Sequence, residues 1–174
     1  MSDVLGNSLE LVIFGESHGP LIGATISGLP SGIKIDDEFI SSQLEKRKAN
    51  DAFSTPRQED DEYKIVSGVF NGYTTGTALT VLIENKNQHS CDYNEVNYRP
   101  GHADYTGSLR YDSFNDHRGG GHFSGRLTAP LVAICSIIIS LAGMLGGVFM
   151  PVQNMGAFST IANALPFLHT VQLG

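Results

Sequence analysis

Cysteine is scarce in this 174-residue sequence, which contains only Cys91 and Cys135 and no Cys-x-x-Cys pair. This argues against a disulfide framework and against a cysteine-based zinc site, and it favours a reducing compartment such as the cytoplasm. No His-Glu-x-x-His or comparable ligand spacing occurs, so we predict no metal site. Residues 1–14 carry acidic residues and no basic start before their apolar stretch, so we expect no signal peptide.

A surplus of basic charge is also missing. Eighteen Asp and Glu residues outnumber 11 Lys and Arg residues, which gives a formal net charge of −7 with neutral histidines. Domains that bind nucleic acids normally carry a basic footprint, so we expect no nucleic-acid partner. Hydrophobic residues make up 41% of the chain, which is enough to bury a core in a domain of this length.

Charge is absent altogether from the end of the chain, since no Lys, Arg, Asp or Glu occurs after Arg126. Residues 131–150 form an apolar run that is long enough to cross a bilayer. Three interpretations stay open: a membrane span, a core helix inside a larger fold, or the product of a broken reading frame. Gly143, Gly146 and Gly147 interrupt the run, and neither end has basic or aromatic anchors. We therefore expect no membrane partner.

Hydrophobic spacing predicts the first elements of the fold. Two short strands are expected at 9–14 and 21–29, joined by the polar loop GESHGP at 15–20. A helix is expected over 36–48, because acidic residues open it, basic residues close it and its apolar residues are spaced for one buried face.

The pair Asn71-Gly72 predicts a tight hairpin turn between strands at 63–70 and 73–84, because these residues accept the positive φ angles of such a turn. Residues 85–126 are polar, rich in Gly, His and Arg, and show little periodicity. Long irregular segments of this kind in compact domains are usually functional or disordered.

Three histidines lie in polar, glycine-flanked settings, namely His18, His102 and His122. An imidazole changes its charge near neutral pH, so each is a candidate acid or base. The alternative for any single one is a loop histidine that caps a turn or faces water.

Glycines 119–121, followed by Ser124 and Arg126, predict a loop whose backbone N–H groups approach an anion closely, although a mobile surface loop has a similar composition. Further basic residues accompany the loops of this acidic chain, and an anionic ligand explains them because arginine matches carboxylate and phosphate oxygens. They are Lys46, Arg47, Lys48, Arg57, Arg99, Arg118 and Arg126.

Five blocks of the sequence, in this order, resemble those of the chorismate synthase family. They are GESHGP at 15–20, STPRQEDDEYKIVSG at 54–68, TTGTAL at 74–79, RPGHADYT at 99–106 and RGGGHFSGRLTAP at 118–130. The resemblance covers about residues 5–133. It implies an α+β fold that is part of a β-α-β sandwich, in which antiparallel sheets pack on helices.

The resemblance also implies an activity. In this family, 5-enolpyruvylshikimate 3-phosphate loses phosphate by 1,4-elimination to give chorismate, in the shikimate pathway of aromatic amino-acid biosynthesis. The family requires reduced FMN without net redox change, with NADPH as a possible reductant. Its members are usually soluble, cytoplasmic homotetramers that act on this small-molecule substrate.

Matching motifs carry the family's site residues onto this chain. The resemblance makes His18 the general acid towards the leaving phosphate and His102 the group that protonates reduced flavin. It assigns FMN contacts to Arg47, His122, Phe123 and Ser124. It assigns contacts with the substrate's phosphate and carboxylates to Arg57, Arg99 and Arg126.

The resemblance predicts a division of the chain at about residue 133. Residues 1–133 match the N-terminal part of the family's domain, and 134–174 form an uncharged apolar tail without family landmarks, which a frameshift would produce. We therefore expect this chain alone to bind FMN poorly and to turn over little. The alternative is a non-catalytic relative that uses the tail for association with a membrane or another protein.

Overall fold

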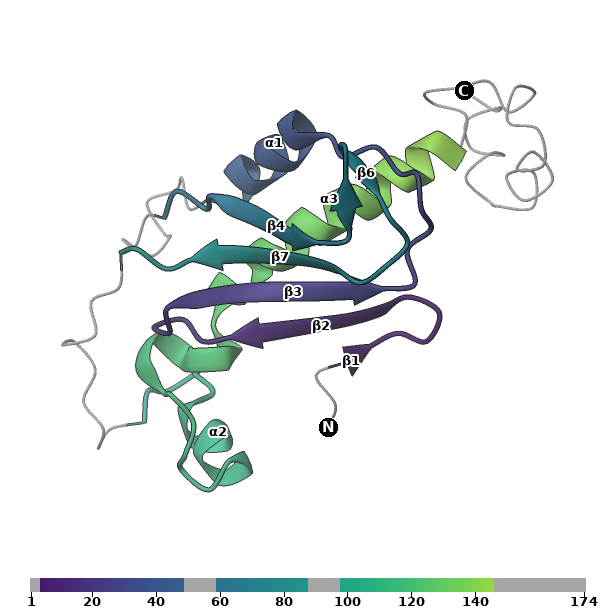
Figure 1. Cartoon of the computed structure of the whole chain (residues 1–174). Helices are drawn as coiled ribbons and strands as arrows, with labels where there is room; N and C mark the ends of the chain where they lie inside the picture. The colour runs from purple at the N-terminus through teal and green to yellow at the C-terminus, as the bar shows by residue number, and fades with distance from the viewer. Residues whose placement is uncertain (1–3, 49–58, 88–97, 146–174) are drawn as a thin grey trace, which may run out of the picture.

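A five-stranded antiparallel sheet forms the body of the protein, in a computed structural model that describes residues 4–48, 59–87 and 98–145. The strand order is β1-β2-β3-β7-β4. Their bounds are β1 Val4–Leu5, β2 Glu10–Gly15, β3 Leu21–Ser27, β7 Leu79–Glu84 and β4 Tyr63–Ser67. Strand β7 lies between β3 and β4, so the two best-buried strands, β3 and β7, are neighbours inside the sheet (Figure 1).

Two helices cover one face of this sheet, α1 (Asp37–Arg47) and α3 (Thr128–Leu145). Helix α3 contacts β3, β7 and α1. The short helix α2 (Asp104–Arg110) projects beyond the sheet (Figure 1), and two 3₁₀ segments, η2 (Arg118–Phe123) and η3 (Gly125–Leu127), lead from it into α3. This arrangement confirms the predicted α+β class with an antiparallel sheet packed on helices.

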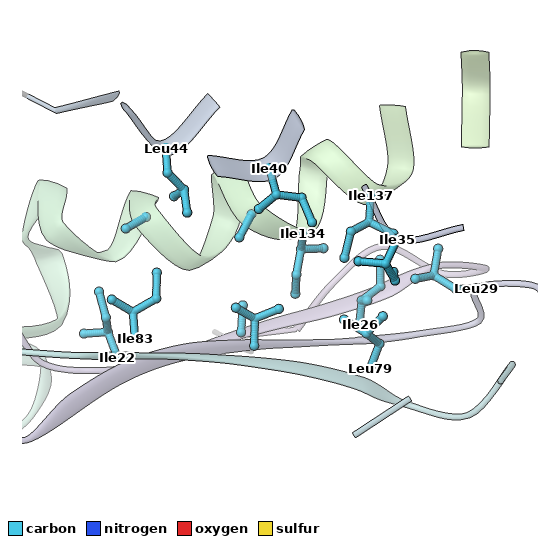
Figure 2. Packing of buried hydrophobic residues seen from close by; sticks show 14 of the residues in the cluster. Ile22, Ile26, Leu29, Ile35, Ile40, Leu44, Leu79, Ile83, Ile134 and Ile137 are labelled. Carbon is cyan, nitrogen blue, oxygen red and sulfur yellow. The ribbon is translucent and has the colours of Figure 1, made fainter. Parts of the chain in front are cut away.

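The core lies between the sheet and the two helices, as Figure 2 shows. Strand side chains alternate across a sheet, so every second residue of β3 and β7 faces the helices. The buried residues are Ile22, Ala24 and Ile26 from β3, Leu79, Val81 and Ile83 from β7, Ile40 and Leu44 from α1, and Ala133, Ile134 and Ile137 from α3. Each fully buried isoleucine or leucine contributes about 1.5–3 kcal/mol relative to an exposed one.

The lack of charge in α3 follows in part from this packing. The segment Arg118–Ala142 is long and apolar enough to cross a membrane by length and composition, and 44% of its most apolar window is buried inside the protein. Ala129, Ala133 and Ile134 are fully buried, whereas Ile139 is 56% exposed. One face of the described part of α3 therefore belongs to the core, as the core-helix interpretation expects.

Most predicted elements occur where the sequence places them. The strands predicted at 9–14 and 21–29 are β2 and β3. Helix α1 begins after Asp36, whose Oδ1 accepts a hydrogen bond of 2.9 Å from the amide of Phe39. Such a cap satisfies one of the N–H groups that a helix leaves unpaired at its start.

The predicted hairpin is correct in its turn and wrong in its continuous strands. Asn71 and Gly72 have positive φ angles and join β5 (Val69–Phe70) to β6 (Tyr73–Thr74). Gly68, at φ +83°, separates β5 from β4, and a Cβ there would lie 2.5 Å from the Cα of Leu79. This close approach explains the break, because the chain must leave the sheet at a residue without a side chain.

Candidate active site around His18

His18 lies in the loop between β2 and β3 and is buried, with 6% of its surface exposed. A second segment holds this loop, because the amide of Ser17 donates a hydrogen bond of 3.0 Å to the carbonyl of Gly121 in η2. The loop also closes on itself, since the amide of Gly19 donates to the carbonyl of Glu16. The structure therefore joins the GESHGP and RGGGHF motifs, which are far apart in the sequence.

Gly119 explains why glycines are needed in the second motif. Its φ is +59°, and a Cβ at this position would lie 2.3 Å from Cε1 and 2.5 Å from Nδ1 of His18. A Cβ at Gly121 would lie 1.8 Å from the carbonyl oxygen of Asp116. These glycines let the backbone approach His18 and the preceding turn. The predicted contact of this loop with an anion stays a prediction.

His122 also connects the two motifs. Its Nδ1 lies 3.0 Å from the carbonyl oxygen of Gly15. A carbonyl only accepts hydrogen bonds, so Nδ1 carries the hydrogen and Nε2 of the neutral ring is left as an acceptor. The ring of Phe123, which is 46% exposed, stands edge-on to that of His122 at a centroid distance of 6.2 Å.

These two side chains line a hollow of about 360 Å³. Its walls combine aromatic rings with two carboxylates: Glu16, Tyr111, Phe114, Asn115, Asp116, His122 and Phe123. Hydrogen bonds from Arg118 hold the pKa of Asp116 below its usual value, and the charge of His18 adds to this effect. The hollow therefore suits a flat, uncharged ring with polar edges better than a phosphate.

A buried ion-pair network connects with the His18 loop through Asn85. The carboxylate of Asp61 is fully buried and pairs with the guanidinium groups of both Arg47 and Arg126. Arg126 also donates from Nε to Oδ1 of Asn85 at 3.0 Å and from a terminal nitrogen to the carbonyl of Glu84 at 3.3 Å. The predicted ligand arginine Arg126 thus has three protein partners, and its contact with substrate stays a prediction.

Asp61 and Asn85 are not among the site residues that the sequence motifs predict. Asp61 lies in a block that resembles the family, but a run of four acidic residues gives no sign of which one is buried. Asn85 directly follows the central strand β7, where a polar residue is a common sign of a strand end. That position was the only available signal.

Arg99 and His102 lie next to the projecting helix α2. The guanidinium of Arg99 makes two hydrogen bonds of 2.8 Å with the carboxylate of Asp104. These bonds lower the pKa of Asp104 to about 2. His102 is exposed, and its amide donates to the carbonyl of Arg99 at 3.2 Å. Its role towards a flavin stays a prediction.

The other predicted site residues have the following positions. The Oγ of Ser124 accepts a hydrogen bond of 3.3 Å from the amide of Arg126 and so caps η3. Arg57 lies outside the described residues. Within 4–48, 59–87 and 98–145, no group of three or more His, Cys, Asp or Glu side chains is placed to hold a metal ion.

A second hollow, of about 310 Å³, lies between the end of α1 and the segment 60–63. It is lined by Ser41, Leu44, Glu45, Lys48, Asp60, Asp61, Glu62 and Tyr63. Four carboxylates against one lysine disfavour an anionic ligand. The predicted ligand arginines that the structure describes, Arg47, Arg99 and Arg126, line neither of the two hollows.

Comparisons with known proteins agree with this arrangement of motifs. The family model of chorismate synthase matches residues 9–164, and thus extends past residue 133. Chorismate synthase of Thermococcus gammatolerans is 52% identical over 129 residues, which cover 73% of this chain and 36% of the relative. That of Dehalococcoides mccartyi is 45% identical over 149 residues, 84% of this chain and 41% of the relative.

A crystal structure of a chorismate synthase matches the fold with a TM-score of 0.57 and 25% sequence identity. The match covers 80% of this chain and 36% of the solved chain. The chain spans less than half the length of the curated relatives named above. On the breadth of the family match and the identity with these relatives, the chain belongs to the chorismate synthase family.

Proposed function

We propose that this chain carries part of the active site for the 1,4-elimination of phosphate from 5-enolpyruvylshikimate 3-phosphate, which yields chorismate. The observation that supports this most directly is the joining of the GESHGP and RGGGHF motifs around the buried His18. Both motifs lie within the segment that matches the family. The imidazole of His18 is buried, and the backbone at Gly119 lies against it.

In this proposal, His18 acts as the general acid towards the departing phosphate. Phosphate leaves more readily when a proton reaches its bridging oxygen, and an imidazolium is a suitable donor near neutral pH. His102 is exposed on the projecting segment, which suits a group that exchanges protons with a cofactor and with solvent.

The aromatic hollow fits the ring of FMN. His122, Phe123 and Tyr111 would hold the ring by edge and face contacts, and Asn115 would meet its polar edge. The carboxylates of Glu16 and Asp116 do not fit a phosphate, so the phosphate end of the cofactor needs a donor elsewhere. When bound, reduced FMN supplies an electron-rich ring without net redox change, and NADPH is the proposed source of its electrons.

Arg47 is the proposed donor for that phosphate end or for another anion. Its Nε is buried and has no hydrogen-bond partner within the described residues. Two guanidinium groups share the single carboxylate of Asp61, so these three side chains together carry one excess positive charge. An anion nearby would balance the excess.

We propose further that the 174-residue chain alone binds FMN weakly and turns over slowly. The substrate carries a phosphate and carboxylates, whereas carboxylates line both hollows and the described arginines Arg47, Arg99 and Arg126 line neither. The chain also spans only 36–41% of the named relatives. We place the enzyme in the cytoplasm as a homotetramer, by analogy with the family.

An anaerobic assay tests this function. Purified chain, photoreduced FMN and enolpyruvylshikimate phosphate are mixed, and chorismate is followed by absorbance for the unsubstituted chain, His18→Ala and His102→Ala. We expect slow formation of chorismate that falls by about 10²–10⁴-fold in His18→Ala. An unchanged rate in His18→Ala would refute the role of His18. Tight FMN binding with fast turnover would refute the proposed incompleteness.

A further inference from the structure

Asn85 connects the His18 loop with the arginine network. It follows β7 directly, and its side chain is buried, with 8% of the residue exposed. Its Nδ2 donates to the carbonyl of Glu16 at 3.1 Å and to that of Gly19 at 2.8 Å. These two carbonyls belong to residues on either side of His18 in the sequence. Its backbone amide adds a third bond to the same loop, at the carbonyl of Pro20.

The orientation of this amide is set by its partners. Oδ1 of Asn85 accepts the hydrogen bond from Nε of Arg126, and a guanidinium has no acceptor. The two loop carbonyls can only accept. If the amide were flipped, Nδ2 would face the N–H of Arg126 and Oδ1 would face the two carbonyl oxygens. Only one orientation of the side chain satisfies all three bonds.

No other small side chain offers the same set of bonds. Asparagine supplies two donors and one acceptor on a short, planar group. Aspartate has no donor for the loop carbonyls, and leucine, of similar shape, has neither donors nor an acceptor. Glutamine adds a methylene group in a buried position, which costs packing energy.

We propose that Asn85 is a positioning residue, which sets the backbone of the loop around His18 and fixes Arg126 relative to it. The catalytic importance of Asn85 rests on the proposed function, whereas its hydrogen bonds to the loop and to Arg126 do not. Through Arg126, the same residue connects His18 with the carboxylate of Asp61 and with Arg47. The side-chain amide of Asn85 thus sets the separation between the His18 loop, which is proposed to meet the leaving phosphate, and Arg126, which is proposed to meet an anionic group of the substrate.

The first experiment compares Asn85→Leu with the control Thr80→Val. Thr80 lies on β7, the strand that leads to Asn85, and its hydroxyl shares a hydrogen bond of 3.0 Å with that of Thr25, away from the His18 loop. Both changes remove hydrogen bonds without adding charge. Proton–carbon NMR spectra of chains with labelled histidine Cε1 atoms, assigned through His18→Gln, report on the imidazole.

We expect Asn85→Leu to change the shift and the titration midpoint of the His18 signal, while the His102 signal stays in place. Thr80→Val should change neither signal. A His18 signal that is identical in Asn85→Leu and in the unsubstituted chain would overturn the proposal. So would an equal change in Thr80→Val, because the effect would then reflect general destabilisation.

A measurement on the unsubstituted chain covers the case that Asn85→Leu does not fold. The two side-chain amide protons of Asn85 should exchange with solvent at least about tenfold more slowly than those of Asn71, which is exposed in a turn. Equal exchange rates would overturn the proposal. Failure of the proposed function is seen separately, as absence of chorismate in the assay, and leaves both NMR results interpretable.

Discussion

Gly119→Ala should displace His18, whereas Gly120→Ala should not. Both glycines have positive φ angles, with φ/ψ of 59°/18° and 87°/1°. Alanine in this left-handed region costs about 1–2 kcal/mol at either position. The two variants therefore share the backbone penalty, and Gly120→Ala serves as the matched control.

The variants differ in what the added methyl group meets. At Gly120 the nearest heavy atom is the Cβ of Ser124 at 3.7 Å, which is an ordinary contact. At Gly119 the nearest heavy atom is Cε1 of His18 at 2.3 Å. Nδ1 of the same ring follows at 2.5 Å and Oγ of Ser17 at 2.9 Å. Carbon atoms pack best at about 3.5–4.0 Å, so the imidazole must move by about 1 Å or more.

Overpacking of this kind adds about 1–3 kcal/mol to the backbone penalty. Urea unfolding should therefore show Gly119→Ala to be less stable than Gly120→Ala by that amount, and the labelled His18 signal should move in Gly119→Ala alone. Equal free energies of unfolding together with an unmoved His18 signal would refute the close contact between the glycine loop and the imidazole.

Three further predictions concern carboxylates. Asp36→Ala removes the cap of α1 and should lower the free energy of unfolding by about 0.5–2 kcal/mol in urea titrations. Asp61→Asn leaves the buried Arg126 and the half-buried Arg47 without their counter-charge and should cost about 3–5 kcal/mol. Asp60→Asn, at an exposed position, should change the free energy of unfolding by no more than about 0.5 kcal/mol, and similar losses for both would contradict the buried network. The pKa of Asp104 is lowered from 3.8 to about 2. The ionised carboxylate therefore contributes fully to the free energy of unfolding above pH 3.8, and this contribution is lost as the pH falls towards 2. Unfolding followed between pH 5 and pH 2 should show a smaller pH dependence for Asp104→Asn, and an unchanged one would exclude the ion pair.

Local elements of the fold could be predicted from the sequence because their causes are local. The spacing of Ile40 and Leu44 and the cap at Asp36 determine α1, and Asn71-Gly72 determines the turn. The break at Gly68 could not be predicted, because it depends on the approach of Leu79 from another strand.

The candidate site could be predicted only as a set of residues. Motifs single out His18, His122, Arg126 and the glycines beside His122, but not the contact of these glycines with His18. Their contact with His18 exists only once two distant segments meet. The same holds for Asp61, whose burial between two arginines depends on the position of η3 against the end of β7.

The bond between His122 and Gly15 joins residues 107 positions apart, and this separation has a consequence for folding. Closing a loop of this length costs chain entropy before any contact repays it, so such contacts form slowly. The hairpin β2–β3 can pair as soon as it leaves the ribosome, but the surroundings of His18 are complete only after η2 has been synthesised and has docked. During folding, the imidazole of His18 should therefore be shielded from solvent only after the hairpin β2–β3 that carries it has formed.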